Sequence, residues 1–342
     1  MYKIIKLSFL SIFIAIFSAA AFCSGVNYSV RSKISLAGTQ GWDYLTDDPA
    51  AARLYVSRGD HVVVIDTAKD SVIGEITGTT GVHGIAVADE FNTGFTSNGK
   101  SNTVTIFDLK TLKVKGEVKA GENPDAIIYD GFSKKVFTFN GKSKDSTVID
   151  AGTGKVLGTI PLGGKPEYAC ADGAGKVYVN IENTSEVAEI DAVRLKVLRR
   201  FSIKPGVEPT GIAIDIKDHI LFSGCHNKMM TILDTISGKL LALVPIGAGV
   251  DACAFDPGRA LAFASNGMDG TLTVIKVLEK GKFDIAQTAA TQKSARTMAL
   301  DTITHKIYLS AASFGKPVVQ TKGGKPERPP VIEGTFAVLV VR

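Results

Sequence analysis

Residues 81–119 read GVHGIAVADEFNTGFTSNGKSNTVTIFDLKTLKVKGEVK, and close variants of this stretch recur along almost the whole sequence. The stretch contains four short runs rich in apolar and β-branched residues, 84–88, 94–97, 103–108 and 114–118, separated by residues that accept turn geometry. None of these runs is long enough for an amphipathic helix. The stretch therefore predicts a unit of four antiparallel strands.

The period of the repeat can be measured on the aspartate that ends each third strand. These residues are Asp66, Asp108, Asp150, Asp191 and Asp234, and successive positions differ by 42, 42, 41 and 43 residues. A period of roughly 40–45 residues with four strands per unit is typical of propeller blades. The fold class predicted from the sequence is therefore all-β, a β-propeller with four antiparallel strands per blade.

Six complete units can be assigned along the chain, and a seventh departs from the pattern. The complete units are 41–77, 81–119, 123–161, 165–203, 208–246 and 249–289. The seventh begins at Ser294, carries a proline-rich insertion at Ala311 to Gly334, and ends with its third strand at Phe336 to Val341. Ser29 to Leu36 resembles the missing fourth strand. We therefore predict seven blades in a ring that the N-terminal strand closes, because closure leaves no exposed sheet edge, and we expect the insertion to be a surface loop.

The N-terminus reads as a secretory signal. Residues 1–24 combine Lys3 and Lys6, an apolar centre and a small-residue end, so we expect a periplasmic or secreted protein whose single domain is residues 25–342. We expect no transmembrane segment after cleavage, and the formal charge falls from +5 to +3 as the two lysines leave. Cys170, Cys225 and Cys253 have no metal-type spacing and are interpreted as packed small apolar residues.

The third strands and blade openings carry a family resemblance. Segments such as IDTAKDSVIGEI, IDAGTGKVLGTI and LDTISGKLLALV, openings such as NPDAI and EPTGI, and the closing RPPVIEGTFAVLVV resemble the YncE or YVTN family of seven-bladed propellers. The resemblance covers essentially all of residues 25–342 and implies an exported propeller. Its motifs build blades and carry little chemistry. One exported family member is associated with DNA binding, but no residue motif here transfers that activity.

The loops that lead into the inner strands should surround one end of the central channel, which we call the channel mouth. Such a concave face is the default position for a binding site. The predicted ligand-binding positions at the channel mouth, with aromatic walls beside them, are Trp42, Asp43, Tyr44, His83, Asp125, Glu167, Tyr168, Thr210, Asp251 and Arg296. Carboxylates and a histidine from separate blades would suit a divalent cation, calcium or magnesium. Alternatively, His83 and Arg296 pair with the acids and the mouth neutralises itself.

The loops between second and third strands supply an outer rim around the mouth. The rim positions are Arg58, His61, Asn98, Lys100, Asn140, Lys142, Asn180, His226, Lys228 and Asn266. The repeated Asn-Gly pairs within them are interpreted as hairpin turns, and the lysines would make the rim basic.

Three functions remain open from the sequence, and no catalytic residue can be assigned. The first is an exported binding or scaffold propeller that presents its loop face to an unknown protein, glycan or small ligand. The second is a metal-dependent hydrolase or lyase at the channel mouth. The third is single-stranded nucleic-acid binding by the basic rim, although the acids of the mouth would repel phosphate.

Overall fold

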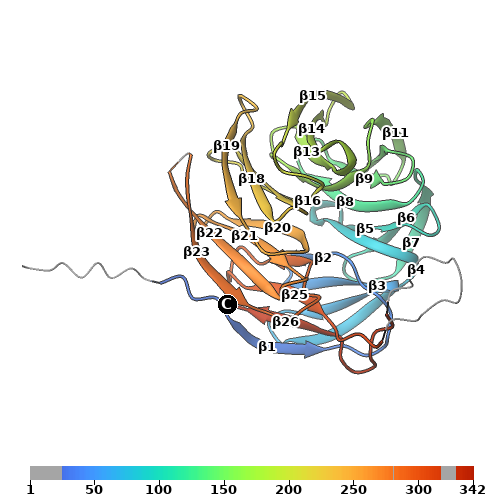
Figure 1. Ribbon diagram of the computed structural model, residues 1–342. Coiled ribbons are helices and arrows are strands. Elements are labelled where there is room, and N and C mark those ends of the chain that lie inside the picture. The colour runs from blue at the N-terminus through green and yellow to red at the C-terminus, as the bar shows by residue number, and fades with distance from the viewer. Residues whose placement is uncertain (1–24, 280, 317–328) are drawn as a thin grey trace, which may run out of the picture.

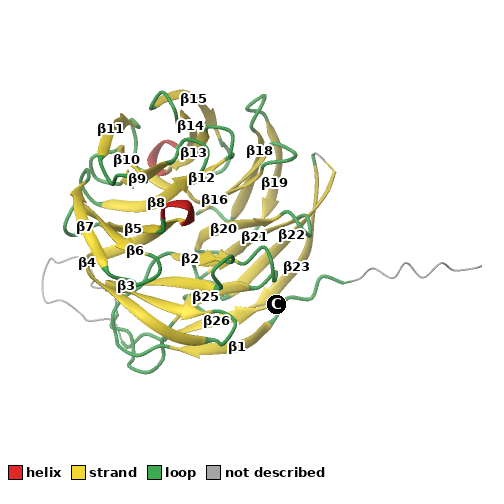
Figure 2. Cartoon of the chain, turned by 180° about the vertical axis from the view of Figure 1, so that it is seen from behind, coloured by secondary structure: helices red, strands yellow, loops and turns green. Residues whose placement is uncertain are grey.

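The computed structural model describes residues 25–279, 281–316 and 329–342, so the signal assignment and most of the proline-rich insertion lie outside the described residues. The chain is folded almost entirely into β-strands that radiate around a centre (Figure 1). The described residues also include two short 3₁₀ turns, η1 (Asp89–Phe91) and η2 (Glu182–Thr184), drawn in red in Figure 2. No helix in the described ranges is long and apolar enough to cross a membrane.

Four of the sheets are four-stranded meanders of consecutive antiparallel strands. The first two comprise β8 (Pro124–Asp130), β9 (Lys135–Asn140), β10 (Asp145–Asp150), β11 (Val156–Pro161) and then β12 (Pro166–Ala171), β13 (Lys176–Ile181), β14 (Glu186–Asp191), β15 (Lys196–Ser202). The other two comprise β16 (Pro209–Asp215), β17 (Ile220–Cys225), β18 (Met229–Asp234), β19 (Leu240–Pro245) and then β20 (Val250–Asp256), β21 (Leu261–Asn266), β22 (Thr271–Glu279), β23 (Lys282–Ala290).

The first two predicted units form one six-stranded sheet, so the described chain contains six sheets and the prediction of seven was wrong. This sheet consists of β2 (Leu45–Asp48), β3 (Arg53–Asp66), β4 (Ser71–Ala88), β5 (Thr93–Asn98), β6 (Thr103–Asp108) and β7 (Val114–Lys119). The sheets merge because β3 and β4 are continuous. Gly59 pairs with Val82, which carries the ladder across the positions where the sequence predicted loops.

The last sheet joins the two ends of the described chain. Its order is β1 (Val30–Ser35), β26 (Ala337–Val341), β25 (Ile307–Ala311), β24 (Met298–Leu300). β1 pairs antiparallel with β26, and Figure 1 shows these two strands side by side. Reciprocal backbone hydrogen bonds of 3.1 Å between Ser29 and Arg342 extend this pairing beyond the two strands.

The repeated aspartates that revealed the period each cap a tight turn. Asp66 accepts the backbone N–H groups of residues 68 and 69, Asp108 those of 110 and 111, and Asp191 those of 193 and 194, all at 2.8–3.1 Å. Such hydrogen bonds mimic a backbone turn, which explains why aspartate recurs there. The backbone N–H of Thr111 is the main reason that the pKa of Asp108 falls to about 2.

Between neighbouring sheets lies a core of small and aromatic apolar side chains. Phe95, Phe137, Phe222 and Phe263 occupy corresponding positions on second strands and are fully buried. Cys225 and Cys253 are buried and Cys170 is partly buried, and all three are free thiols, as their interpretation as packing residues predicts. Burial raises the pKa of each thiol.

Candidate functional site

The inner strands place their first residues around one end of the channel. β2, β4, β8, β12, β16, β20 and β24 contact one another in cyclic order, and β24 returns to β2. Five of these strands show a register break that spans the predicted mouth residue. The breaks lie between Val82 and Ile85, Pro124 and Ile127, Pro166 and Ala169, Pro209 and Ile212, and Val250 and Ala252. A β-bulge changes the direction in which a side chain points. The mouth residue at each bulge therefore need not follow the alternation of side chains between the two faces of its strand.

The structure brings five of the predicted charged residues together at the channel mouth. His83 Nδ1 lies 2.6 Å from Asp43 Oδ2 and 3.5 Å from Asp125 Oδ1. Arg296 Nη1 lies 2.5 Å from Asp251 Oδ2, and its guanidinium also contacts Asp43 Oδ1 at 3.3 Å. These side chains are 16–30% exposed, so the cluster is accessible from the mouth yet largely desolvated.

Desolvation dominates the electrostatics of this cluster. Burial, and then the charge of Asp43, raises the pKa of Asp125 to about 7. Burial alone would lower the pKa of His83, but the hydrogen bond to Asp43 and the charges of Asp125 and Asp43 outweigh it and raise that pKa. Burial likewise raises the pKa of Asp251, although Arg296 opposes the rise. Asp125 Oδ1 is buried and has no hydrogen-bond partner.

A second charged group extends the mouth on the side of β12. Lys165 Nζ lies 2.5 Å from Glu167 Oε1 and also contacts Glu182. Burial, and then Asp125, raises the pKa of Glu167, and Lys165 opposes that rise. Among the described residues the mouth therefore contains five acids, Asp43, Asp125, Glu167, Glu182 and Asp251, against three basic side chains, His83, Lys165 and Arg296.

The remaining predicted mouth residues have structural contacts. The rings of Tyr44 and Tyr168 stack with centroids 4.9 Å apart, and the hydroxyl of Thr210 donates to the carbonyl of Val250 at 2.9 Å. The ring of Trp42 contacts two other aromatic rings. That ring packs between Phe314 and Phe336, with centroids 5.8 and 5.1 Å away.

Half of the predicted outer-rim residues are buried and do not lie on an exposed rim. Arg58 is fully buried, with its guanidinium 3.6 Å from the centroid of Phe336 and hydrogen bonds to three backbone carbonyls. The side chains of four predicted rim asparagines are also fully buried and brace the strands or turns beside them: Asn98, Asn140, Asn180 and Asn266. Each side-chain NH₂ group donates two hydrogen bonds, and the Oδ1 atoms of Asn98 and Asn180 also accept one, whereas those of Asn140 and Asn266 accept none. The donated hydrogen bonds offset much of the cost of burying these amides.

Each Asn-Gly pair opens a hairpin loop, but neither residue of a pair has the positive φ of the expected turn type. The positive φ angles fall four residues after each asparagine, at Asn102, Lys144 and Gly270. The glycines are needed for close approach instead. A Cβ at Gly99 would lie 2.6 Å from His83 Nε2, and one at Gly267 would lie 2.6 Å from Arg296 Cβ. Glycine at these positions therefore makes room for mouth residues of the neighbouring inner strand.

The exposed part of the rim carries both signs of charge. Lys100, Lys142, Lys228 and His226 are exposed, and His61 is partly exposed. His61 pairs with Asp60 and His226 with Glu208, at 2.8 and 3.2 Å. Asp60 and Asp269 are exposed acids on the same loops, and the exposed acids Glu122 and Glu208 lie beside them on the loops that lead into β8 and β16. Within the described residues the rim is therefore mixed in charge, and the prediction of a basic rim was wrong.

Three serines that were not among the predicted site residues support the mouth. The hydroxyl of Ser97 donates to the carbonyl of Asp125, and that of Ser265 donates to the carbonyl of Arg296. Ser57 plays a related part by accepting the N–H of Asp43 at 2.9 Å. The signal was present in the sequence as the repeated Ser-Asn-Gly at 97–99 and 265–267, of which only the Asn-Gly part was interpreted.

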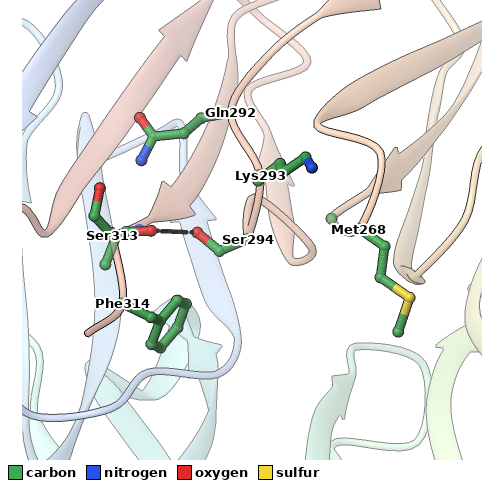
Figure 3. A pocket seen from close by; sticks show the side chains of 8 residues that line it. Met268, Gln292, Lys293, Ser294, Ser313 and Phe314 are labelled. Atoms are coloured by element: carbon green, nitrogen blue, oxygen red, sulfur yellow. Dashed lines mark hydrogen bonds between the residues drawn. The ribbon is translucent and has the colours of Figure 1, made fainter. Parts of the chain in front are cut away.

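A cavity of about 590 Å³ lies between the last two sheets, next to the mouth. Figure 3 shows Met268 and Phe314 on opposite sides of it, with Gln292 and Lys293 above and Ser294 and Ser313 along one wall. The hydroxyl of Ser294 donates to the carbonyl of Ala312 at 2.8 Å, which fixes that wall. The cavity adjoins the mouth because Gly267, which lines it, packs against Arg296.

The radial four-stranded sheets, their inner strands in cyclic contact and the channel mouth define the chain as a β-propeller. No protein family model and no curated protein matches it. Among solved structures it is similar to one described as Kuenenia stuttgartiensis hydrazine synthase, with a TM-score of 0.51 and 16% sequence identity over 71% of this chain and 97% of that chain. At this identity the similarity shows the fold alone.

Proposed function

We propose that this protein is an exported binding propeller that holds a positively charged ligand at its channel mouth. The observation that carries the proposal is the excess of acids over basic side chains among the described residues of a largely desolvated cluster, where one carboxylate oxygen of Asp125 accepts no hydrogen bond and lies 3.5 Å from His83. Uncompensated carboxylates are costly to bury. A cationic ligand would remove that cost and gain affinity from doing so.

The same proposal includes the wider assignments from the sequence. Residues 1–24 direct export to the periplasm or the exterior, the chain is a distant member of the YncE or YVTN family, and the pairing of β1 with β26 closes the ring. The cavity beside Met268 and Phe314 would accept an apolar part of a ligand whose charged group lies at the mouth.

The mixed rim argues against nucleic acid as the partner. A groove for a single strand combines a continuous positive surface with exposed aromatic rings. Here the exposed lysines of the rim alternate with acids, and the aromatic rings of Tyr44 and Trp42 are engaged in contacts within the protein.

Calorimetric titration with putrescine, in the presence of EDTA, tests the proposal. We expect the wild type to bind the diamine and the double variant Asp125→Asn, Asp251→Asn to lose that binding. A single-stranded DNA oligonucleotide should not bind at moderate salt. Strong, salt-sensitive DNA binding without any binding of putrescine would replace this proposal with the nucleic-acid function.

A further inference from the structure

The acids and the histidine of the mouth include one group with the composition of a metal site. One ligand atom each from Asp43, His83 and Asp125 can be chosen so that all three lie within 4.8 Å of one another. They come from the segment before β2, from β4 and from β8, which are far apart in sequence and adjacent in space. Convergence of one imidazole and two carboxylates from three strands is not required by the packing of any single sheet.

The distances are close to those around a bound ion. Ligand atoms on a tetrahedral zinc ion, with bonds of about 2.1 Å, lie about 3.4 Å apart. His83 Nδ1 and Asp125 Oδ1 are 3.5 Å apart, which meets this spacing without movement. His83 Nδ1 and Asp43 Oδ2 are 2.6 Å apart, the separation of a hydrogen bond. A metal ion would replace the proton of that hydrogen bond and move the two atoms apart by less than an ångström.

The surroundings also favour an added cation. Asp125 Oδ1 accepts no hydrogen bond and lies 3.5 Å from His83 Nδ1, so a bound cation would give this oxygen a direct partner. Arg296 contacts the other oxygen of Asp43, at 3.3 Å, and is held more closely by Asp251 at 2.5 Å and by the carbonyl of Trp42 at 3.0 Å. Arg296 therefore does not occupy the oxygen of Asp43 that faces His83.

We propose that Asp43, His83 and Asp125 bind a divalent ion of the zinc class at the channel mouth. Calcium prefers six to eight oxygen ligands and magnesium an octahedral set with several waters. A set of one imidazole and two carboxylates suits zinc or another transition metal better. Three protein ligands would leave a position open toward the mouth. This inference rests on the proposed function, because it names the cation that the mouth holds.

The test is zinc binding by the full-length mature protein after treatment with EDTA and its removal. We expect one Zn²⁺ per chain by calorimetry, and visible absorption bands when Co²⁺ replaces it. His83→Ala and Asp125→Asn should each weaken binding at least about 100-fold, since loss of a mere supporting contact already costs about 10–100-fold. A millimolar excess of Ca²⁺ or Mg²⁺ should not compete.

The matched control is the double variant His226→Ala, Glu208→Gln, which removes an exposed histidine–carboxylate pair on the same face. It should bind zinc as the wild type does. Absence of zinc binding by folded wild type, or equal affinity in His83→Ala, would overturn the inference. If zinc fails and putrescine binds, the mouth is a site for organic cations and only this inference falls. If neither binds, the proposed function falls with it.

Discussion

The carboxylate of Asp47 allows a direct test of how much a buried charge without a hydrogen-bond partner lowers the stability of this fold. Both of its carboxylate oxygens are buried without a hydrogen-bond partner. Burial, followed by repulsion from Asp301 and Asp48, raises its pKa from 3.8 to about 7, and Lys306 only partly opposes this. The folded state therefore holds the proton more tightly than the unfolded chain does. Stability from this group is full below about pH 4 and is lost as the pH rises through 7.

The replacement Asp47→Asn keeps the shape of the side chain and removes its charge. The difference between 3.8 and about 7 corresponds to about 4 kcal/mol in total, because one pKa unit is ~1.4 kcal/mol. Part of that cost is already present at pH 5, where the unfolded carboxyl is ionised. We therefore expect the advantage of the variant over the wild type to grow by about 2–3 kcal/mol between pH 5 and pH 8.

Denaturant unfolding of both proteins at pH 5 and pH 8 measures this change. Other groups titrate in the same range, so the quantity to compare is the difference between variant and wild type at each pH. Asp218→Asn, at an exposed turn, is the control and should show an unchanged difference. If Asp47→Asn also showed the same difference at both values, the buried carboxyl would have found a partner and the reasoning would be refuted.

Three further predictions concern the mouth, the turns and the terminal strand. Gly99→Ala should destabilise the fold by about 1–3 kcal/mol and perturb the NMR signals of His83, because the added Cβ would meet the imidazole. The control Gly116→Ala should do neither, because its added Cβ would have no atom within 4 Å. Asp108→Ala should lower the melting temperature more than Asp108→Asn, which keeps an acceptor for the turn; equal losses would mean that the turn hydrogen bonds are unimportant. Deletion of residues 26–37 should expose the edge of β26 and cause aggregation in size-exclusion chromatography, and a monomer with unchanged melting temperature would contradict the role given to β1.

Local patterns predicted the strands well because their causes are local. The strand 103–108 was predicted with its observed bounds, since alternation defines it and Asp108 caps the following turn. The merger of two units was missed because the pairing of Gly59 with Val82 depends on how two long strands lie, not on either sequence alone. Arg58 was misplaced for the same reason, since Phe336, which covers it, comes from the other end of the chain.

The sequence predicted which residues lie at the channel mouth but not the contacts and distances between them. Its residues could be named because blade periodicity fixes which loop positions surround the channel. Their pairing could not, because the bulges that turn Asp125 and Asp251 leave no mark in the alternation of apolar residues. The distances that distinguish a proton from a metal ion between His83 and Asp43 arise only when three separate strands are packed.

The pairing of β1 with β26 also has a consequence for the order of folding. Each of the other described sheets pairs strands that follow one another along the chain, so its contacts form with short loop closures. β1 can pair only after the C-terminal strand has been synthesised and β25 is in place. During synthesis the backbone of β1 stays unpaired, and open to other chains, while the intervening sheets fold. Completion of the last sheet is therefore the folding step most exposed to misassembly.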